Sequence, residues 1–366
     1  MNTKIDNRMG WIRNIEKIKK KGTKTYIVEY EIATECRIPG VLDYMDSKIL
    51  CGPLTMEKDL NGLYHYSLKI EYYQNESYNQ GEKNRKGYYF NGGIVGEIMS
   101  IFSLYFRCRF YLIATYTGEL SDHGLRMKKE HTLVYRACNP AIHPPIFSSS
   151  NKNFAKGLSD FLNLIKLLDD KYHQQFILSC GHYARSLKEV GIDSEMVFIR
   201  LVSSIESLSQ FIKLTKGDDL FKGKKIEDII KIEDLPKDDM DELKKIFETR
   251  KAKVKFVNFI MNNSHGCLRG GNYKAKHCKI KKVSLPKVLS AIYTARSEYL
   301  HNGDTMYLSS PIHGGEKWDT DPTVGMTIDN RFFSASQKLP YTYFFEGLVR
   351  CCLINFLKNS QNLLQK

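Results

Sequence analysis

The sequence predicts an α+β fold, in which a β-rich N-terminal domain over residues 1–150 is followed by an all-α helical domain over residues 151–366. Apolar residues alternate with polar ones in the first half and recur every three or four positions in the second. Between the halves, residues 139–150 contain Asn-Pro and His-Pro-Pro steps and three consecutive serines, a composition typical of a linker. With 366 residues, 42% of them apolar and 26% charged, the chain has the composition of a globular protein rather than a disordered, collagen-like or coiled-coil one.

The side-chain period predicts the elements of the first half. Residues 24–32 and 63–73 carry aromatic and aliphatic side chains at every second position, which predicts two half-buried strands. Residues 94–106 are predicted to form a helix, and 109–117 and 131–137 to form strands. No motif in this half identifies a ligand, so we expect only that it recognises a trigger or a substrate.

The second half is predicted to be mainly helical. Two apolar stripes at helical spacing are Phe198, Leu201, Val202, Ile205, Leu208 and Ile212, and then Phe345, Leu348, Cys352 and Phe356. A third stripe predicts a helix over residues 288–301, and consists of Leu289, Ile292, Ala295 and Tyr299. Asn302-Gly303 directly after it is a typical helix stop.

Positive charge is concentrated in one block of the chain. The net charge is +14, which favours nucleic acid, an anionic membrane or an acidic protein as partner. Residues 251–300 alone contain eleven Lys or Arg and a single acid, so a local anion-binding face is expected. The lysines available for phosphates are Lys274, Lys276, Lys279, Lys281 and Lys282, preceded by Lys251, Lys253 and Lys255. The alternative is a solvated charged face without a ligand.

Targeting signals and cysteine usage favour the cytoplasm. Residues 1–22 lack the apolar core of a secretory signal. The most apolar stretch, residues 92–117, is interrupted by Glu97, Arg107 and Arg109, so we expect no membrane span. Nine cysteines are an odd number, and they are expected to be reduced thiols rather than a disulfide framework.

No metal or other cofactor is expected. Possible nitrogen and sulfur ligands for zinc are His265, Cys267, His277 and Cys278. No C-x2-C is present, however, and His277 and Cys278 are adjacent, which makes joint ligation awkward. Cys351 and Cys352 lie on the last apolar helix and are expected to be packing residues. P-loop, Gly-rich dinucleotide, G-x-S-x-G and H-E-x-x-H motifs are absent, so common NTPase, dehydrogenase, hydrolase and zincin mechanisms lack their parts.

The strongest chemical signal is an Arg and a His near the end of the predicted helix over residues 288–301. Arg296 and His301 form an R-x4-H motif, and five residues on a helix amount to about 140° of rotation and about 7.5 Å of rise. One helix therefore makes a poor complete site, whereas two copies around a twofold axis bring both pairs into one cleft. There an imidazole can take the proton of a ribose 2′-OH or give one to the leaving 5′-oxygen, while a guanidinium stabilises the phosphorane charge. The motif thus predicts a homodimer with a composite site for RNA.

Residues 292–303, with the sequence IYTARSEYLHNG, resemble the signature of HEPN domains, in particular the Apea-like HEPN family of bacterial defence proteins. Three further segments in the same order fit that family: residues 201–208, residues 276–280 with Leu285-Pro286, and residues 339–346. The resemblance covers residues 155–360 approximately. It implies a dimeric helical bundle and a metal-independent endoribonuclease that leaves 2′,3′-cyclic phosphate and 5′-hydroxyl ends.

The resemblance also implies which residues act. Arg296 and His301 correspond to the catalytic pair, Ser297 to the polar residue that follows the arginine, and Asn302 is a supporting residue after the histidine. Proteins of this kind commonly act as toxins or abortive-infection effectors against phage, while some members are non-catalytic. We therefore expect an antiviral ribonuclease, with a non-catalytic adaptor that binds RNA or a protein partner as the alternative.

One glutamate and two tyrosines each have two possible roles. Glu206 either orients Arg296 or His301, as an acid in this helix does in similar proteins, or makes a structural ion pair. Tyr293 and Tyr299 either stack on bases or belong to the core, and the core is favoured for Tyr299.

Overall fold

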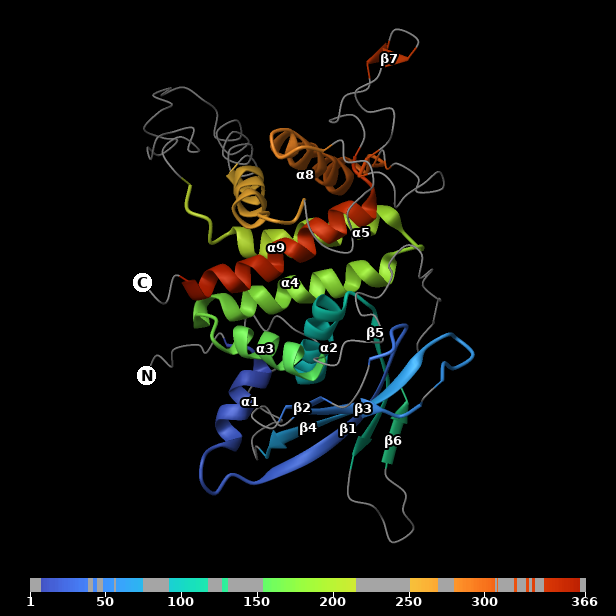
Figure 1. Cartoon of the computed structure of the whole chain (residues 1–366), viewed down its shortest axis with the longest axis vertical. Helices are drawn as coiled ribbons and strands as arrows, with labels where there is room; N and C mark the ends of the chain where they lie inside the picture. The colour runs from blue at the N-terminus through green and yellow to red at the C-terminus, as the bar shows by residue number, and fades with distance from the viewer. Residues whose placement is uncertain are drawn as a thin grey trace, which may run out of the picture. The chain divides into compact units, whose positions relative to one another are not determined.

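The structure, a computed structural model, has an α+β fold that contains an antiparallel sheet and a larger set of helices (Figure 1). It describes residues 8–38, 42–44, 49–55, 57–74, 92–117, 127–130, 154–214, 251–268, 280–306, 308, 319–320, 327–328, 331–332 and 339–362. The chain forms two compact units, residues 1–193 with 357–366 and residues 194–356. No helix within the described ranges is long and apolar enough to cross a membrane.

The first unit contains a six-stranded antiparallel sheet with the strand order β2-β3-β4-β1-β5-β6. Its strands are β1 (Thr25–Thr34), β2 (Leu42–Tyr44), β3 (Ile49–Pro53), β4 (Tyr64–Tyr73), β5 (Phe110–Thr117) and β6 (Met127–Glu130). β1 and β4 pair along their whole length, from Thr25 opposite Tyr73 to Thr34 opposite Tyr64. The strands predicted at 24–32, 63–73 and 109–117 are thus confirmed, while the one predicted at 131–137 lies outside the described residues.

Burial alternates along these strands as the sequence period requires. On β4, Tyr66, Leu68 and Ile70 are buried, whereas Ser67 and Lys69 between them are partly exposed. The helices α1 (Gly10–Ile18) and α2 (Gly93–Phe106) pack against each other, α1 against β4 and α2 against β5. α2 confirms the helix predicted over residues 94–106.

A buried carboxylate joins α1 to α2. Glu97 on α2 is 3% exposed, and its two oxygens accept hydrogen bonds from the backbone N–H groups of Gly10 and Trp11, each at 2.9 Å. These N–H groups belong to the first turn of α1 and have no partner within the helix. The positive end of the α1 dipole also favours the negative charge of Glu97. This contact explains why an acid interrupts the most apolar stretch of the sequence.

Two further helices belong to the sheet-containing unit, α3 (Phe154–Lys166) and α4 (Asp170–Glu189). Asp169 caps α4 by accepting a hydrogen bond from the N–H of Lys171 at 3.1 Å. The predicted boundary at residue 150 lies outside the described residues, and the compact units divide after residue 193. The division falls there because α4 packs extensively on α2. In the sequence, α2 precedes the linker-like residues 139–150 and α4 follows them, so these residues do not divide the two units.

The second unit is built mainly from helices. It contains α5 (Ser194–Ser209), a helix over residues 251–263, α8 (Leu285–Asn302), the short hairpin β7 (Thr327–Ile328) and β8 (Arg331–Phe332), and most of α9 (Thr342–Asn362). Five residues of the predicted stripe are buried on α5, whereas Ile212 lies beyond the end of that helix and is half-buried; the five are Phe198, Leu201, Val202, Ile205 and Leu208. Phe198 stacks on Phe345 of α9 with 5.3 Å between ring centroids. α8 ends at Asn302, and Gly303 follows in the left-handed region with φ of 76°, as the sequence predicts.

Candidate active site

Arg296 on α8 is held by Glu206 on α5. The Nη2 atom of Arg296 donates a hydrogen bond to Oε2 of Glu206 at 2.8 Å, and the two side chains are 19% and 25% exposed. The other oxygen of Glu206, Oε1, accepts a hydrogen bond from the hydroxyl of Tyr293 at 2.8 Å. The guanidinium carbon also lies 5.9 Å from the centroid of the Tyr293 ring. One carboxylate therefore binds two α8 side chains and limits the orientations open to Arg296.

The local sequence explains this arrangement. Tyr293 and Arg296 are three positions apart, so they lie on the same face of α8 one turn apart. Tyr293 is only 4% exposed, which places the ring in the core and its hydroxyl at the edge where Glu206 lies. Burial raises the pKa of Tyr293, and the charge of Glu206 raises it further, so the hydroxyl stays protonated as a donor at neutral pH.

A second cation approaches the same part of α8. Nζ of Lys253, on the helix over residues 251–263, donates a hydrogen bond to Oγ1 of Thr294 at 2.8 Å. On the same helix, the ring of Phe256 lies 5.3 Å from the ring of Tyr293. Residues of α5 and of the helix over residues 251–263 thus contact the part of α8 that carries Arg296, and the sequence alone connected only Glu206 of α5 with it.

His301 lies in the last turn of α8 and is exposed. Within the described residues, no hydrogen bond reaches the imidazole of His301 or the hydroxyl of Ser297, which is half-buried. Asn302 is exposed, and its Nδ2 donates to Oδ2 of Asp304 at 3.3 Å. Arg296 and Glu206 are therefore brought together, whereas no hydrogen bond or ion pair joins the His301 side chain to either of them among the described residues.

Two of the predicted phosphate-binding lysines lie immediately before α8. Lys281 and Lys282 are exposed, while Lys274, Lys276 and Lys279 lie outside the described residues. The N–H of Ile280, just before the two exposed lysines, donates to Oδ2 of the buried Asp319 at 2.7 Å. This bond fixes the point at which the basic stretch enters α8.

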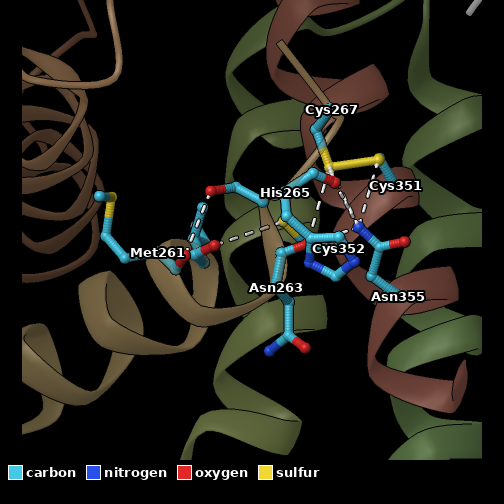
Figure 2. Close-up of a disulfide and its surroundings, with 9 residues drawn as sticks. Met261, Asn263, His265, Cys267, Cys351, Cys352 and Asn355 are labelled. Carbon is cyan, nitrogen blue, oxygen red and sulfur yellow. Dashed lines mark hydrogen bonds between the residues drawn. A yellow bond between two sulfur atoms is a disulfide. The ribbon is translucent and has the colours of Figure 1, made fainter. Parts of the chain in front are cut away.

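The cysteines differ from the expectation of reduced thiols, because Cys267 and Cys351 form a disulfide (Figure 2). Their Cα atoms are 5.8 Å apart although 84 positions separate them, a proximity that only tertiary structure creates. Cys351 is therefore a cross-link rather than only a packing residue, and a disulfide sulfur is not a thiolate ligand for zinc. Cys352 is fully buried, which confirms its packing role. His277 and Cys278 lie outside the described residues.

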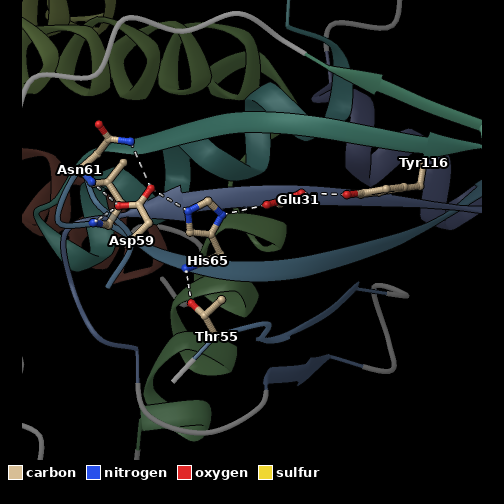
Figure 3. Close-up of polar contacts among 7 residues, drawn as sticks. Glu31, Thr55, Asp59, Asn61, His65 and Tyr116 are labelled. Carbon is tan, nitrogen blue, oxygen red and sulfur yellow. Dashed lines mark hydrogen bonds and ion pairs between the residues drawn. The ribbon is translucent and has the colours of Figure 1, made fainter. Parts of the chain in front are cut away.

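The sheet unit contains a polar cluster that the sequence analysis missed (Figure 3). His65 on β4 contacts two carboxylates, Glu31 on β1 through Nδ1 at 2.8 Å and Asp59 through Nε2 at 3.1 Å. The Tyr116 hydroxyl on β5 donates to the second oxygen of Glu31 at 2.8 Å. Burial lowers the pKa of His65, but the hydrogen bonds to Asp59 and Glu31 outweigh it and raise that pKa above its ordinary value. The cluster therefore favours an imidazolium between two carboxylates.

Comparison with known proteins finds no match to the chain, neither a family model nor a curated protein nor a solved structure.

Proposed function

We propose that the chain is a metal-independent endoribonuclease of the HEPN type, in which Arg296 and His301 perform the chemistry. The observation that carries this proposal is the anchored guanidinium of Arg296 five residues before an exposed imidazole on the same helix. An oriented cation and an accessible imidazole are the two groups that cleavage at a ribose 2′-OH requires.

The reaction needs one proton acceptor and one proton donor. His301 takes the proton of the ribose 2′-OH, the 2′-oxygen attacks the adjacent phosphorus, and the bond to the 5′-oxygen breaks. A protonated imidazole supplies the proton to the leaving 5′-oxygen, which leaves 2′,3′-cyclic phosphate and 5′-hydroxyl ends. Arg296 stabilises the additional negative charge on the phosphorane, and its planar guanidinium suits two phosphate oxygens at once.

The proposed active site is completed by a second copy of the chain. In one copy, Arg296 and His301 are five residues apart on α8, and no hydrogen bond joins their side chains within the described residues. A twofold axis beside α8 supplies the second imidazole for the proton transfer to the leaving group. Exposure of His301, Asn302 and Leu300 at the end of α8 keeps this end of the helix open for such a partner.

The rest of the chain has supporting roles in this proposal. The exposed Lys281 and Lys282, with Lys274, Lys276 and Lys279 before them, bind RNA phosphates. The sheet-containing unit recognises a trigger that controls cleavage. The proposed biology is antiviral defence in the cytoplasm by abortive infection, which rests on the family resemblance alone.

One observation favours a second candidate function, a non-catalytic HEPN adaptor that binds RNA or a protein. Because Arg296 is already paired with Glu206 inside the chain, a structural ion pair accounts for both residues without a substrate. In that case His301 is an exposed residue without a chemical role.

The deciding experiment incubates purified protein with total cellular RNA in the presence of EDTA and identifies the fragment ends. Wild type is expected to leave 2′,3′-cyclic phosphate and 5′-hydroxyl ends, while Arg296→Ala and His301→Ala leave the RNA intact. His265→Ala is the matched control, because His265 is an exposed histidine of the same unit outside the proposed site. Cleavage that persists in folded His301→Ala protein contradicts the proposed chemistry. Intact RNA with every variant, from well-folded protein, favours the adaptor.

A further inference from the structure

The Cys267–Cys351 pair differs from the other cysteines in accessibility. Both of its residues are half-buried, whereas the five free cysteines of the described chain, Cys36, Cys51, Cys108, Cys180 and Cys352, are all buried. Burial raises the pKa of Cys51 to about 12 and raises the pKa values of Cys108, Cys180 and Cys352 as well. Buried thiols do not exchange readily with disulfides, so among the described cysteines the bonded pair is the one open to redox chemistry.

The disulfide anchors one short segment to α9 (Figure 2). Residues 264–268 follow the helix over residues 251–263, and the side-chain amide of Asn355 on α9 binds them. Nδ2 of Asn355 donates to the carbonyl oxygens of Asn263 and His265 at 2.8 and 2.9 Å. The same nitrogen lies 3.6 Å from the sulfur of Cys267 and 3.8 Å from that of Cys351. The segment thus has a covalent anchor and a weaker polar one at the same place.

The helix before this segment has attachments of its own that do not depend on the disulfide. Cys352 donates its S–H to the carbonyl of Ile260 at 3.8 Å, and the rings of Phe259 and Phe356 are 5.6 Å apart. Near the other end of the helix, Lys253 and Phe256 contact α8. Breaking the disulfide therefore leaves the helix packed, and its effect is restricted to the segment after residue 263.

We propose that Cys267–Cys351 is a thiol–disulfide switch that controls how firmly the chain is anchored immediately before its basic residues 274–282. In the oxidised state residues 264–268 are fixed to α9. In the reduced state residues 264–268 lose the covalent anchor and keep hydrogen bonds, among them those from Asn355 to His265 and from Ser264 to Met261, which are exchangeable with water. The feature is local, reversible and separate from the Arg296 site.

The chemistry is a thiol–disulfide exchange with a dithiol. One thiolate of the dithiol attacks either sulfur, which forms a mixed disulfide and releases the other cysteine as a thiolate. The second thiol of the dithiol then attacks the mixed disulfide. The protein gains two electrons and two protons as a pair of thiols, and the dithiol becomes a disulfide.

The test combines peptide mapping with hydrogen exchange on the full chain. Protein purified without reductant is expected to give a Cys267–Cys351 linked peptide in mass spectrometry, and dithiothreitol is expected to remove it reversibly. On reduction, amides in residues 264–268 are expected to exchange about tenfold faster or more, with no change in α4. Absence of the linked peptide, resistance to millimolar dithiothreitol, or unchanged exchange after reduction each overturns the proposal.

Matched variants separate the bond from its neighbours. Cys267→Ser and Cys351→Ser are expected to show the fast exchange of the reduced wild type and no further response to dithiothreitol. Cys352→Ala removes the adjacent thiol but not the bond, so it is expected to respond as wild type does. If one of the serine variants fails to fold, the comparison of oxidised and reduced wild type still decides the question.

An effect on RNA binding rests on the proposed function and is measured separately. The affinity of oxidised and reduced wild type for a single-stranded RNA oligonucleotide is compared at fixed salt, with a difference of about threefold or more expected. Changed exchange with equal RNA affinity supports the switch and contradicts its link to RNA.

Discussion

Glu206 controls the chemistry open to Arg296, because the same carboxylate both orients the guanidinium and neutralises its charge. Oriented by one hydrogen bond to Glu206 Oε2, the guanidinium keeps other N–H groups for a phosphate. Tyr293 reinforces this by binding the opposite oxygen of the carboxylate. The hydroxyl of Tyr293 is therefore a positioning group that acts on Arg296 through Glu206.

Removal of that hydroxyl tests the positioning role. Tyr293→Phe is expected to lower the free energy of unfolding by about 0.5–1.5 kcal/mol, the usual contribution of one such hydrogen bond. If the proposed ribonuclease is correct, kcat is expected to fall about tenfold or more with little change in KM, because Arg296 acts on the transition state. Urea denaturation and RNA cleavage kinetics measure the two effects.

Tyr299→Phe is the matched control for this prediction, because Tyr299 is a half-buried tyrosine on the same helix. It is expected to change stability by less than about 0.5 kcal/mol. Glu206→Gln, measured alone and with Tyr293→Phe, completes a double-mutant cycle. Additive effects in that cycle contradict the coupling of Tyr293 to Glu206. Faster cleavage by Glu206→Gln shows that the ion pair with Glu206 inhibits the action of Arg296 on RNA instead of assisting it.

At the scale of elements, the His65 cluster links the strands of the sheet to the turn before β4. Asp59 accepts hydrogen bonds from the N–H groups of Asn61 and Leu63, and it also binds His65, which in turn binds Glu31 on β1. Burial raises the pKa of Asp59, but the hydrogen bonds from Leu63 and His65 lower it overall. The protonated imidazole of His65 thus links the turn, through Asp59, to β1, through Glu31.

This connection predicts how the stability of the sheet unit depends on pH. A histidine whose pKa rises on folding adds stability below its ordinary pKa of 6.5 and loses that contribution as pH rises through the folded value. Asp59, whose pKa falls on folding, adds stability above its ordinary pKa of 3.8 and loses it as pH falls through the folded value. The two contributions coexist from about pH 4 to about pH 6.5, and the histidine contribution declines above that window.

Thermal unfolding of wild type and His65→Gln across pH 4 to 9 is the measurement. The difference in Tm is expected to be largest below about pH 6.5 and to shrink towards pH 9. His265→Gln controls for the loss of a histidine elsewhere in the chain. A difference in Tm that is constant with pH, or that grows with rising pH, shows that the proton on His65 does not hold the turn.

The helices and strands also show which features a sequence is able to predict. β1, β4, β5, α2 and α8 were predicted because their periods of 2 and 3.6 residues are properties of adjacent positions. The end of α8 at Asn302 was predicted because Gly303 adopts positive φ without steric cost. Glu97 was read only as an interruption, since its partners Gly10 and Trp11 are 87 and 86 positions away. Long-range pairings of this kind leave no local period.

Among the candidate residues, the sequence points to Arg296, His301 and Glu206, but it gives no sign of the positioning role of Tyr293. A tyrosine three positions before an arginine is common on helices, and only the position of α5 places a carboxylate between them. The disulfide was missed for the same reason, because pairing depends on where α9 meets residue 267. The unit boundary was placed at a linker-like composition, whereas the packing of α4 on α2 sets the division in the structure.

At the scale of the whole molecule, the proposed ribonuclease requires two chains. Arg296 points to Glu206 within its own chain, whereas His301 is exposed at the end of α8, so a shared cleft has to receive groups from both copies. Light scattering is therefore expected to give a molar mass twice that of the chain, and dilution below the dimer dissociation constant is expected to reduce cleavage per chain.

Mixing two inactive variants tests whether the site is composite. Arg296→Ala and His301→Ala are each expected to be inactive alone, but a mixed dimer carries one intact arginine and one intact histidine in the same cleft. After unfolding and refolding together, cleavage is expected to return in part. Mixed dimers are roughly half of the total under random pairing, and each acts below the wild-type rate because its single imidazole has to serve both proton transfers. If mixed dimers form and no activity returns, each chain uses its own Arg296 and His301. A monomer that cleaves RNA at the full rate contradicts the shared cleft altogether, because one α8 separates its two groups by about 140°.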